Sequence, residues 1–471
     1  MKFKYTIAFT TSFAESIIKY IIVICVIFST CACRKLIEIA PPTGQLIPEK
    51  VFNDEKSATA AMAGLYLTLA NFSATSLPVI TTSCSADELI DYTDSYTDYY
   101  TNNIKVDDAW NDLIWSGYYS TIYNANAILE ALENNSALSG GFKTQISGEA
   151  LFIRAYCYFQ LVNLYGDIPL LTSTKVNLNA TTPRTSTSIV YTQIISDLKN
   201  AQGSLSDAYV TKERVRANKS AATALLARIY LYNKKWEDAE TQATAVINNP
   251  QYALCTDLDS VFLANNQESI LQLWVQNGYT DLAAQIIPSF NPLLTYIPSF
   301  IDSLEPGDKR QEKWIDSLPY NGVTYYYPYK YKLNGTPTSS SEYFVVMRLA
   351  ELYLIRAEAR INNNKIADGV KDLNILRNRA RQTPSISIPN PLPDLPLNLS
   401  LNNALAAVAK ERKNELSSEE CHRWFDLKRT GGINSISSQK PGNWRANVSA
   451  YPVPLIEISA NPTLVQNPGY N

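Results

Sequence analysis

Histidine is nearly absent from this 471-residue chain, which contains one, His422. A single histidine excludes a histidine-rich metal site and, away from its own neighbourhood, a serine–histidine–aspartate triad. The net charge is −3 and no basic block occurs, which argues against nucleic-acid binding. After Cys33 the cysteines are isolated, so the Cys-x-x-Cys spacing of metal and redox motifs is missing. We therefore expect no cofactor, no metal and no nucleic-acid partner.

Long hydrophobic runs are missing except near the N-terminus. The run from Tyr20 to Phe28 is about half the length that spans a bilayer, and it follows the basic "MKFK". Residues 1–32 are therefore predicted to be an export signal. Ala32-Cys33 resembles a bacterial lipoprotein cleavage site and predicts lipidation of Cys33, with Cys31 as a competing acceptor. Such a lipid would hold the protein on a membrane by burying methylene groups.

Aromatic residues are abundant, with 30 Tyr, 14 Phe and 7 Trp. Many lie in segments whose apolar residues recur every three or four positions, the pattern of a helix with one buried side. This pattern predicts helices within residues 57–72 and 107–134 and a buried one that Gly166 and Pro169 end. Arg154 in that third helix is expected to pair with a buried carboxylate.

The clearest helix pair covers residues 221–250 and resembles the tetratricopeptide repeat. Its Ala-x-x-Tyr step recurs at irregular intervals, beginning at Ala63, Ala155, Ala227 and Ala350. The predicted fold is mainly α, an α-solenoid of irregular tetratricopeptide-like helix pairs with long loop insertions and a few short strands. We expect a strand at 270–275, an irregular hairpin at 320–335 and a C-terminal tail that wraps the surface in an extended form.

Several segments in order closely resemble the SusD/RagB family. They are "FNDEKSATAAMAGLY", "RAYCYFQLVNLYGDIPL", "ARIYLYNKKWEDA", "MRLAELYLIRAEA", "ERKNELSSEECHRWFDLKRTG" and "YPVPLIEISANPTLVQNPGY". The resemblance implies a signal peptide at 1–32, an N-terminal helical region at 33–260 and a C-terminal region with binding loops and tail at 261–471. One departure is Cys421, where the family usually has glycine, so we expect the local turn to differ.

The resemblance also implies a cellular role. Members are lipid-anchored nutrient-binding proteins of the Bacteroidetes outer membrane, facing the outside. Their partner is a TonB-dependent transporter of the SusC type, and their ligands are oligosaccharides in most cases and peptides in some. The leading hypothesis is thus capture of an oligosaccharide and its delivery to the transporter, with peptide capture as the alternative.

A surface glycosidase is a third hypothesis, and it would start from the glutamates between residues 411 and 420. Arginines and lysines are interleaved with these glutamates, and cations lower carboxylate pKa values, whereas a general acid needs a raised pKa. Helical spacing allows Glu419 to pair with Arg423. We therefore expect structural ion pairs and no catalytic residue.

Two aromatic segments are better candidates for ligand binding. Residues 87–103 combine tyrosines with acidic residues and lack an apolar stripe, so they are predicted to form an exposed loop. Flat aromatic rings stack on sugar faces, while Asp and Asn bind hydroxyl groups. The predicted ligand-binding residues are Asp91, Tyr96, Asp98, Tyr99, Tyr100, Trp274, Asn277 and Tyr279. The alternative is that these tyrosines cover the surface or contact the transporter.

Overall fold

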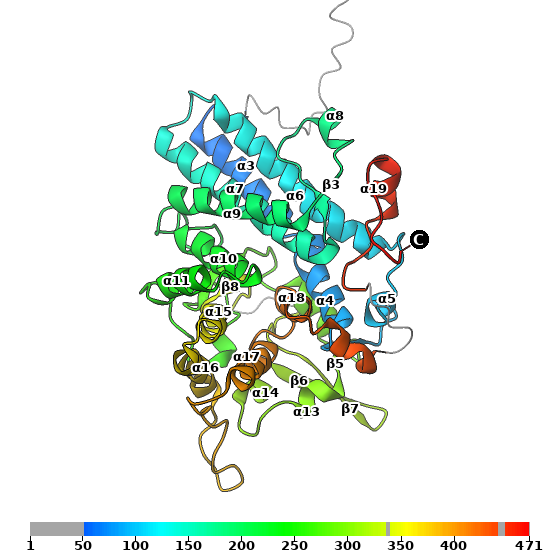
Figure 1. Cartoon of the computed structure of the whole chain (residues 1–471), viewed down its shortest axis with the longest axis vertical. Coiled ribbons are helices and arrows are strands. Elements are labelled where there is room, and N and C mark those ends of the chain that lie inside the picture. Colours follow the sequence, from blue (N-terminus) through cyan, green and yellow to red (C-terminus); the bar gives the residue numbers. More distant parts are fainter. Residues whose placement is uncertain (1–50, 336–339, 441–447, 471) are drawn as a thin grey trace, which may run out of the picture. The chain divides into compact units, whose positions relative to one another are not determined.

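The computed structural model describes residues 51–335, 340–440 and 448–470. The predicted export signal and the predicted lipidation site, Cys33, lie outside the described residues. Residues 52–471 form one compact unit, which is mainly helical with a few short strands, as predicted (Figure 1). In the part of the chain that is described, no helix combines the length and apolar character needed to cross a lipid bilayer.

The elements have the following bounds. The α-helices are α3 (Glu55–Leu69), α4 (Ser76–Ser85), α5 (Thr97–Tyr100), α6 (Ala109–Glu133), α7 (Gly140–Tyr165), α8 (Val176–Asn179), α9 (Thr187–Ser204), α10 (Lys219–Tyr232), α11 (Trp236–Ile247), α12 (Asp281–Ile286), α13 (Pro298–Asp302), α14 (Lys309–Lys313), α15 (Leu349–Asn362), α16 (Ile366–Ala380), α17 (Leu401–Glu415), α18 (His422–Arg429) and α19 (Leu455–Ala460). The 3₁₀ helices are η1 (Phe72–Ala74), η2 (Leu258–Ser260) and η3 (Ile433–Gln439). The strands are β1 (Leu89–Asp91), β2 (Ile168–Pro169), β3 (Arg184–Thr185), β4 (Ser269–Leu273), β5 (Leu294–Tyr296), β6 (Ile315–Tyr320), β7 (Val323–Pro328) and β8 (Phe344–Arg348).

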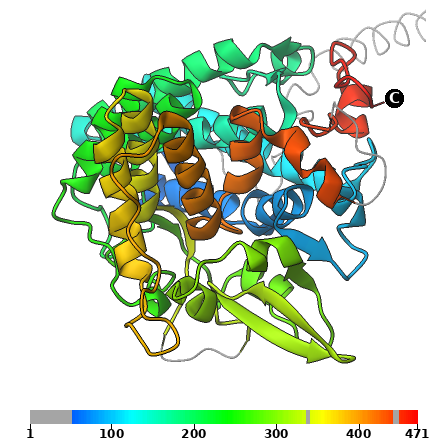
Figure 2. The ribbon, with the colours of Figure 1, turned by 60° about the horizontal axis from the view of Figure 1, so that its bottom comes forward.

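Four helix pairs build the scaffold: α3 with α6, α7 with α9, α10 with α11, and α15 with α16. Each pair contacts the next, through α6 and α7, α9 and α10, and α11 and α15, which makes a stack in chain order (Figures 1 and 2). The first helix of every pair carries one of the Ala-x-x-Tyr steps. The prediction of irregular helix pairs with long insertions is therefore confirmed, and the longest insertion lies between α11 and α15.

Small residues set the spacing within these pairs. Ala155, Ala227 and Ala350 are fully buried, whereas Ala63 at the start of the stack is exposed. In the last pair, a Cβ on Gly369 would lie 2.6 Å from Ile361 and 2.7 Å from the carbonyl oxygen of Ala357. Only glycine therefore allows α16 to approach α15 this closely.

The strands form four two-stranded antiparallel sheets, which pair β1 with β5, β2 with β3, β4 with β8, and β6 with β7. The sequence correctly predicts β4. The hairpin β6–β7 is more regular than expected, because six consecutive residue pairs align from Ile315 and Pro328 to Tyr320 and Val323. Asn321 and Gly322 both have positive φ at its turn, which suits the twist of a tight hairpin.

A buried ion cluster lies where the β4–β8 sheet, α14, α16 and α17 meet. Its members are Glu268, Asp308, Arg310, Lys330, Arg348, Arg379, Glu411, Glu415 and Glu419. Arg348, at the end of β8, is its centre: its guanidinium lies 2.7 Å from Glu419, 2.6 Å from Glu415 and 2.9 Å from Glu268. Through these ion pairs the cluster links the β4–β8 sheet, the repeat helix α16 and the helix α17.

The C-terminal tail does not follow the prediction of an extended surface wrap. It forms the short helix α19, and Tyr451 and Val453 are fully buried. Backbone groups fix it to the first repeats: the amide of Tyr451 donates to the carbonyl of Leu164 at 2.9 Å, and the side chain of Asn467 donates to the carbonyl of Tyr165 at 2.9 Å. Buried aromatic packing outweighs the prolines that suggested an exposed segment.

Cys421 keeps the turn that glycine would favour. Its φ is 61° and it immediately precedes α18, so the expectation of a different local turn is wrong. The left-handed conformation strains a residue with a Cβ, and burial of the small side chain among packed helices holds it there.

Removal of Arg348 tests the importance of the ion cluster. We expect Arg348→Met to lower the free energy of unfolding by about 3–5 kcal/mol, because three carboxylates lose their shared cation while buried. Urea unfolding followed by tryptophan fluorescence measures the change. The matched control is Lys371→Met, which removes an exposed pair with Asp368 and should change stability by about 0.5 kcal/mol or less. Equal effects of both variants would contradict the central role of Arg348.

Candidate functional site

The segment 87–103 is more buried than the sequence suggests. Asp87 and Glu88 are buried, and β1 pairs with β5, so the prediction of one exposed loop is wrong for its first part. Asp87 is held there by Arg423 at 2.6 Å and Lys413 at 2.8 Å. Asp91 ends β1, and its carboxylate accepts hydrogen bonds from the backbone amides of Thr93 and Tyr96, both at 2.8 Å. These two hydrogen bonds fix the backbone of the loop from Thr93 to Tyr96.

The other residues predicted in this segment have different surroundings. Tyr99 has no exposed surface, and its hydroxyl donates to Asp108 at 2.6 Å, so its side chain offers no surface to a ligand in this structure. Tyr96 is 3% exposed. Asp98 pairs with Lys105 at 3.2 Å, and the ring of Tyr100 lies 5.1 Å from the amino group of Lys440.

The loop after β4 holds the second group of predicted residues. Trp274 follows the last residue of β4 and is 41% exposed. Gly278 has a φ of 73°, and its carbonyl accepts the amide of Glu342 at 2.8 Å, which turns the chain back toward the start of β8. Thr280 then caps α12 by accepting the amide of Ala283. These bonds present Trp274, Asn277 and Tyr279 on one short, anchored loop.

Trp274, Asn277 and Tyr279 line one cavity of about 270 Å³, which we call the aromatic cavity. Its opposite wall comes from the end of α3 and from η1. The full lining is Leu67, Ala70, Asn71, Phe72, Trp274, Val275, Gln276, Asn277, Tyr279 and Asp281. The predicted residues of the post-β4 loop therefore lie together, next to residues more than 200 positions earlier in the chain.

Aromatic contacts extend this surface toward the first segment. The ring of Phe72 meets Trp110 edge to face at a centroid distance of 6.2 Å, and Trp110 stacks on Tyr96 at 5.8 Å. The indole nitrogen of Trp110 donates to the carbonyl of Ser95 at 3.1 Å, which fixes the ring. Tyr96 thus packs against Trp110, which in turn contacts the cavity residue Phe72. Sequence reasoning missed Phe72 and Trp110, whose only signal was an aromatic residue near a helix end.

The lining suits recognition better than bond cleavage. Exposed Trp274 and half-buried Phe72 and Tyr279 offer ring faces, and amide groups from Asn71, Gln276 and Asn277 surround them. Rings stack on apolar faces of a ligand, while amides both donate and accept hydrogen bonds. Asp281 is the single carboxylate of the lining, whereas glycoside hydrolysis by the usual route needs two.

The glutamates from 411 to 420 are buried parts of the scaffold. Glu411 and Glu415 contact Arg310 at 2.6 and 2.9 Å, as expected of structural ion pairs. The predicted pair of Glu419 with Arg423 is wrong, because the helix breaks after Glu415 and begins again at His422. Glu419 instead contacts Lys330 at 2.5 Å, and Arg423 binds Asp87. The prediction for Arg154 is confirmed by its 2.7 Å contact with Asp197.

Neighbouring cations lower the pKa of some of the glutamates from 411 to 420 but not of others. Burial acts to raise the pKa of Glu415, but the charges of Arg379, Arg348 and Arg310 outweigh it and hold that pKa well below its usual range. Burial raises the pKa of Glu420 to about 8, since Arg228 at 3.5 Å offsets the loss of water only in part. The hydroxyl of Tyr156 donates to the Glu420 carboxyl at 2.9 Å. The expectation of lowered pKa values therefore fails at Glu420 and also at Glu411, whose pKa is raised by burial.

Fold and cavity together define a helical-repeat protein with an aromatic-lined cavity beside its first helix pair. Two family models match it: one for starch-binding proteins associating with the outer membrane, over residues 41–231, and one for the SusD family, over residues 309–470. The chain belongs to the SusD/RagB family, a family of carbohydrate-binding proteins associated with the outer membrane.

Individual relatives agree with this assignment. A SusD-like protein from Formosa agariphila is 26% identical, over 97% of this chain and 99% of its own length. A SusD superfamily structure from Parabacteroides distasonis has the same fold, with a TM-score of 0.76, 23% identity and coverage of 88% and 99%. A laminarin-binding SusD-like protein gives a TM-score of 0.72 at 25% identity, covering 88% of this chain and all of that one.

The raised pKa of Glu420 predicts a pH-dependent effect of Glu420→Gln. The folded protein keeps this proton up to about pH 8, whereas the unfolded chain loses it near the ordinary value of 4.5. The wild-type free energy of unfolding therefore loses this contribution as pH rises from about 4.5 to 8. Glutamine has no proton to lose, so the variant should become more stable relative to wild type, by about 2 kcal/mol or more at pH 9.

The measurement is urea unfolding of both proteins at pH 5, 7 and 9, compared as a difference at each pH. Glu419→Gln is the matched control, because cations hold the pKa of Glu419 below its usual value and the sign is reversed. That variant should be less stable than wild type at pH 7. A difference for Glu420→Gln that does not change with pH would refute the assignment.

Proposed function

We propose that this chain captures oligosaccharides in the aromatic cavity and delivers them to a TonB-dependent transporter of the SusC type, without breaking a bond. The observation that carries the proposal is the meeting of Trp274, Asn277 and Tyr279 with Asn71 and Phe72 around one open cavity. Membership of a carbohydrate-binding family and the laminarin-binding relative support it.

The mechanism follows from the lining. Trp274 stands 41% exposed at the end of a sheet strand, so a sugar ring can stack on it without a rearrangement of the scaffold. Asn71, Asn277 and Gln276 would then bind hydroxyl groups at the ring edge. Release to a transporter requires a short residence time, which an open, partly hydrated cavity favours over a closed one.

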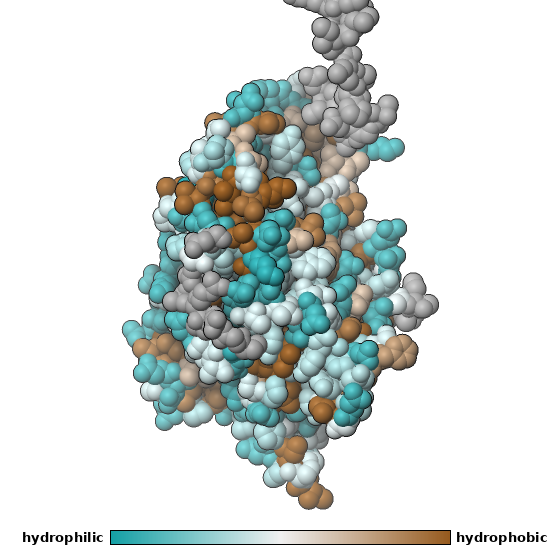
Figure 3. Space-filling model, turned by 90° about the vertical axis from the view of Figure 1, so that its right-hand side faces the viewer, coloured by the Kyte–Doolittle hydropathy of each residue, from teal (hydrophilic) through white to brown (hydrophobic). Residues whose placement is uncertain are grey.

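Lipid anchoring at Cys33 and an outward-facing position in the outer membrane belong to the same proposal. An anchored protein that hands over its ligand needs a surface for the transporter apart from the cavity. Figure 3 shows hydrophobic side chains gathered on the face that carries α8 and α19. We call this the apolar face; its exposed residues are Val176, Leu178, Leu455, Ile456 and Val465.

Hydrogen bonds hold the two helices of the apolar face in place. The side chain of Asn461 donates to the carbonyl of Thr182 at 2.9 Å, and Arg184 donates to the carbonyl of Val465 at 2.7 Å. Several exposed apolar side chains on ordered backbone are typical of a surface that binds another protein. We assign the transporter contact to this face.

Trp274→Ala tests the cavity. We expect it to weaken binding of the captured oligosaccharide about tenfold, which corresponds to ~1.4 kcal/mol, through loss of the stacking surface. Isothermal titration against laminarin, starch oligosaccharides and peptides identifies the ligand first and then measures the variant. Phe290→Ala is the matched control, since Phe290 is 84% exposed and lies outside the cavity lining. A protein that binds peptides alone, or equal losses in the two variants, would contradict glycan capture here.

The double variant Leu178→Ser, Ile456→Ser tests the apolar face. We expect it to abolish co-purification with the transporter from detergent extracts while oligosaccharide affinity changes less than twofold. Removing apolar side chains from an interface weakens association because less apolar surface leaves water. Ile386→Ser is the control, because Ile386 is fully exposed on the loop after α16, away from the apolar face. Retained co-purification in the double variant would exclude this face as the contact.

A further inference from the structure

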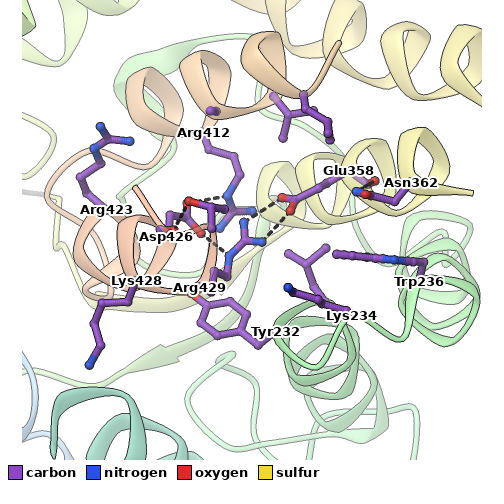
Figure 4. Close-up of a pocket in the computed structure, with 16 residues that line it drawn as sticks. Tyr232, Lys234, Trp236, Glu358, Asn362, Arg412, Arg423, Asp426, Lys428 and Arg429 are labelled. Carbon is purple, nitrogen blue, oxygen red and sulfur yellow. Dashed lines mark hydrogen bonds and ion pairs between the residues drawn. The ribbon is translucent and has the colours of Figure 1, made fainter. Parts of the chain in front are cut away.

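A second and larger cavity, of about 690 Å³, lies between the turn joining α10 to α11 and the helices α15, α17 and α18 (Figure 4). We call it the basic cavity. Its lining is Leu231, Tyr232, Lys234, Trp236, Glu358, Asn362, Leu405, Val408, Ala409, Arg412, Arg423, Asp426, Lys428, Arg429, Thr430 and Gly431. None of these residues lines the aromatic cavity, so the two sites are separate.

Arg412 is the unusual group in this cavity. It is 3% exposed, and its Nε donates to Asp426 at 2.6 Å. Its two terminal nitrogens, Nη1 and Nη2, are buried and have no hydrogen-bond partner among the described residues. Figure 4 shows the side chain reaching from α17 toward the middle of the lining residues. Unpaired donors on a buried cation are costly, which indicates a missing acceptor.

The carboxylates nearby are already engaged by Arg429. Both Nη atoms of Arg429 bind Glu358, at 2.5 and 2.8 Å, and its Nε binds Asp426 at 2.7 Å. Glu358 thus forms a two-bond pair, and Asp426 accepts from both arginines. Each carboxylate therefore already has cationic donors, and the Nη atoms of Arg412 remain without an acceptor.

The balance of charge in the cavity favours an anion. Arg423 is paired with Asp87 outside the lining, and Lys428 donates to the carbonyl of Asn163. Three cations, Lys234, Arg412 and Arg429, then face two carboxylates. Burial lowers the pKa of Lys428 to about 7, so this lysine adds further positive charge in mildly acidic solution.

The hydroxyl of Tyr232 is a second polar group without a partner. It is buried, and it comes from α10, on the wall opposite α17. In Figure 4 Lys428 and Arg423 point away from the centre, and Arg429, whose guanidinium carbon lies 5.2 Å from the centroid of the Tyr232 ring, stands between Tyr232 and Arg412. The Tyr232 hydroxyl from α10 and the Nη atoms of Arg412 from α17 are thus unpaired groups that belong to the lining of the same cavity.

We propose that the basic cavity binds a small molecule through an oxyanion group, a carboxylate, sulfate or phosphate, held by the Nη atoms of Arg412 with help from Tyr232 and Lys234. Guanidinium groups match the two oxygens of such an anion. Apolar side chains of Leu405, Val408 and the Trp236 ring form the remaining wall, so the rest of the ligand is a ring or an apolar group. The volume lies in the range of small-molecule sites.

The test is isothermal titration of the full folded chain with sodium sulfate, sodium phosphate and sodium glucuronate, at constant ionic strength with chloride. At least one anion should bind, and the three arms separate sulfate, phosphate and carboxylate chemistry. Lys234→Gln should weaken that binding about fivefold or more. The matched control Lys235→Gln, one residue along the same turn and outside the lining, should change affinity less than twofold.

A crystal soaked in selenate locates the anion directly by its anomalous signal, expected within hydrogen-bond distance of Arg412. Arg412→Gln should remove that signal. If Arg412→Gln fails to fold, the loss of anion affinity in Lys234→Gln is the test instead. Trp274→Ala should leave anion affinity unchanged, so this site and the proposed glycan site fail independently. Ordered water alone at Arg412, or equal losses in Lys234→Gln and Lys235→Gln, would overturn the proposal.

Discussion

The buried ion cluster around Arg348 is the constraint on which the rest of this structure depends. Four cations and five carboxylates from seven chain segments meet there with almost no access to water. Removing charges from water is unfavourable, so such a cluster persists only when every segment supplies its partner in the right place. It therefore specifies one arrangement of sheet and helices, where purely apolar packing would permit several.

The position of the aromatic cavity follows from this constraint. Glu268 enters the cluster immediately before β4, and Arg348, which pairs with Ser269 across the sheet, enters it at the end of β8, so both strands are fixed at the same end of this sheet. Trp274 is the first residue beyond the fixed strand. A stiff scaffold thus places an exposed ring near η1, while the amides around it come from the post-β4 loop and from the end of α3. This division suits a family in which the same fold serves different ligands.

The sequence predicted the helical scaffold because helix periodicity and small-residue steps are local signals. It predicted the grouping of Trp274, Asn277 and Tyr279 because they lie within six residues on one loop. It did not predict the burial of Tyr99, whose hydroxyl binds Asp108 nine residues later. It failed for the partner of Glu419, because Lys330 lies 89 residues earlier in the chain. Phe72 carried only the weak signal of an aromatic residue near a helix end, because only the folded structure brings η1 beside the post-β4 loop.

The C-terminal tail has a consequence for how the molecule is made. Asn467 hydrogen-bonds to Tyr165, 302 residues earlier, and buried Tyr451 packs against Tyr99 and Tyr165. A ribosome therefore completes α6 and α7 long before it delivers the side chains that cover them. Until the last residues emerge, aromatic side chains of these helices remain uncovered. Closure of the oldest helices of the polypeptide therefore awaits its youngest residues.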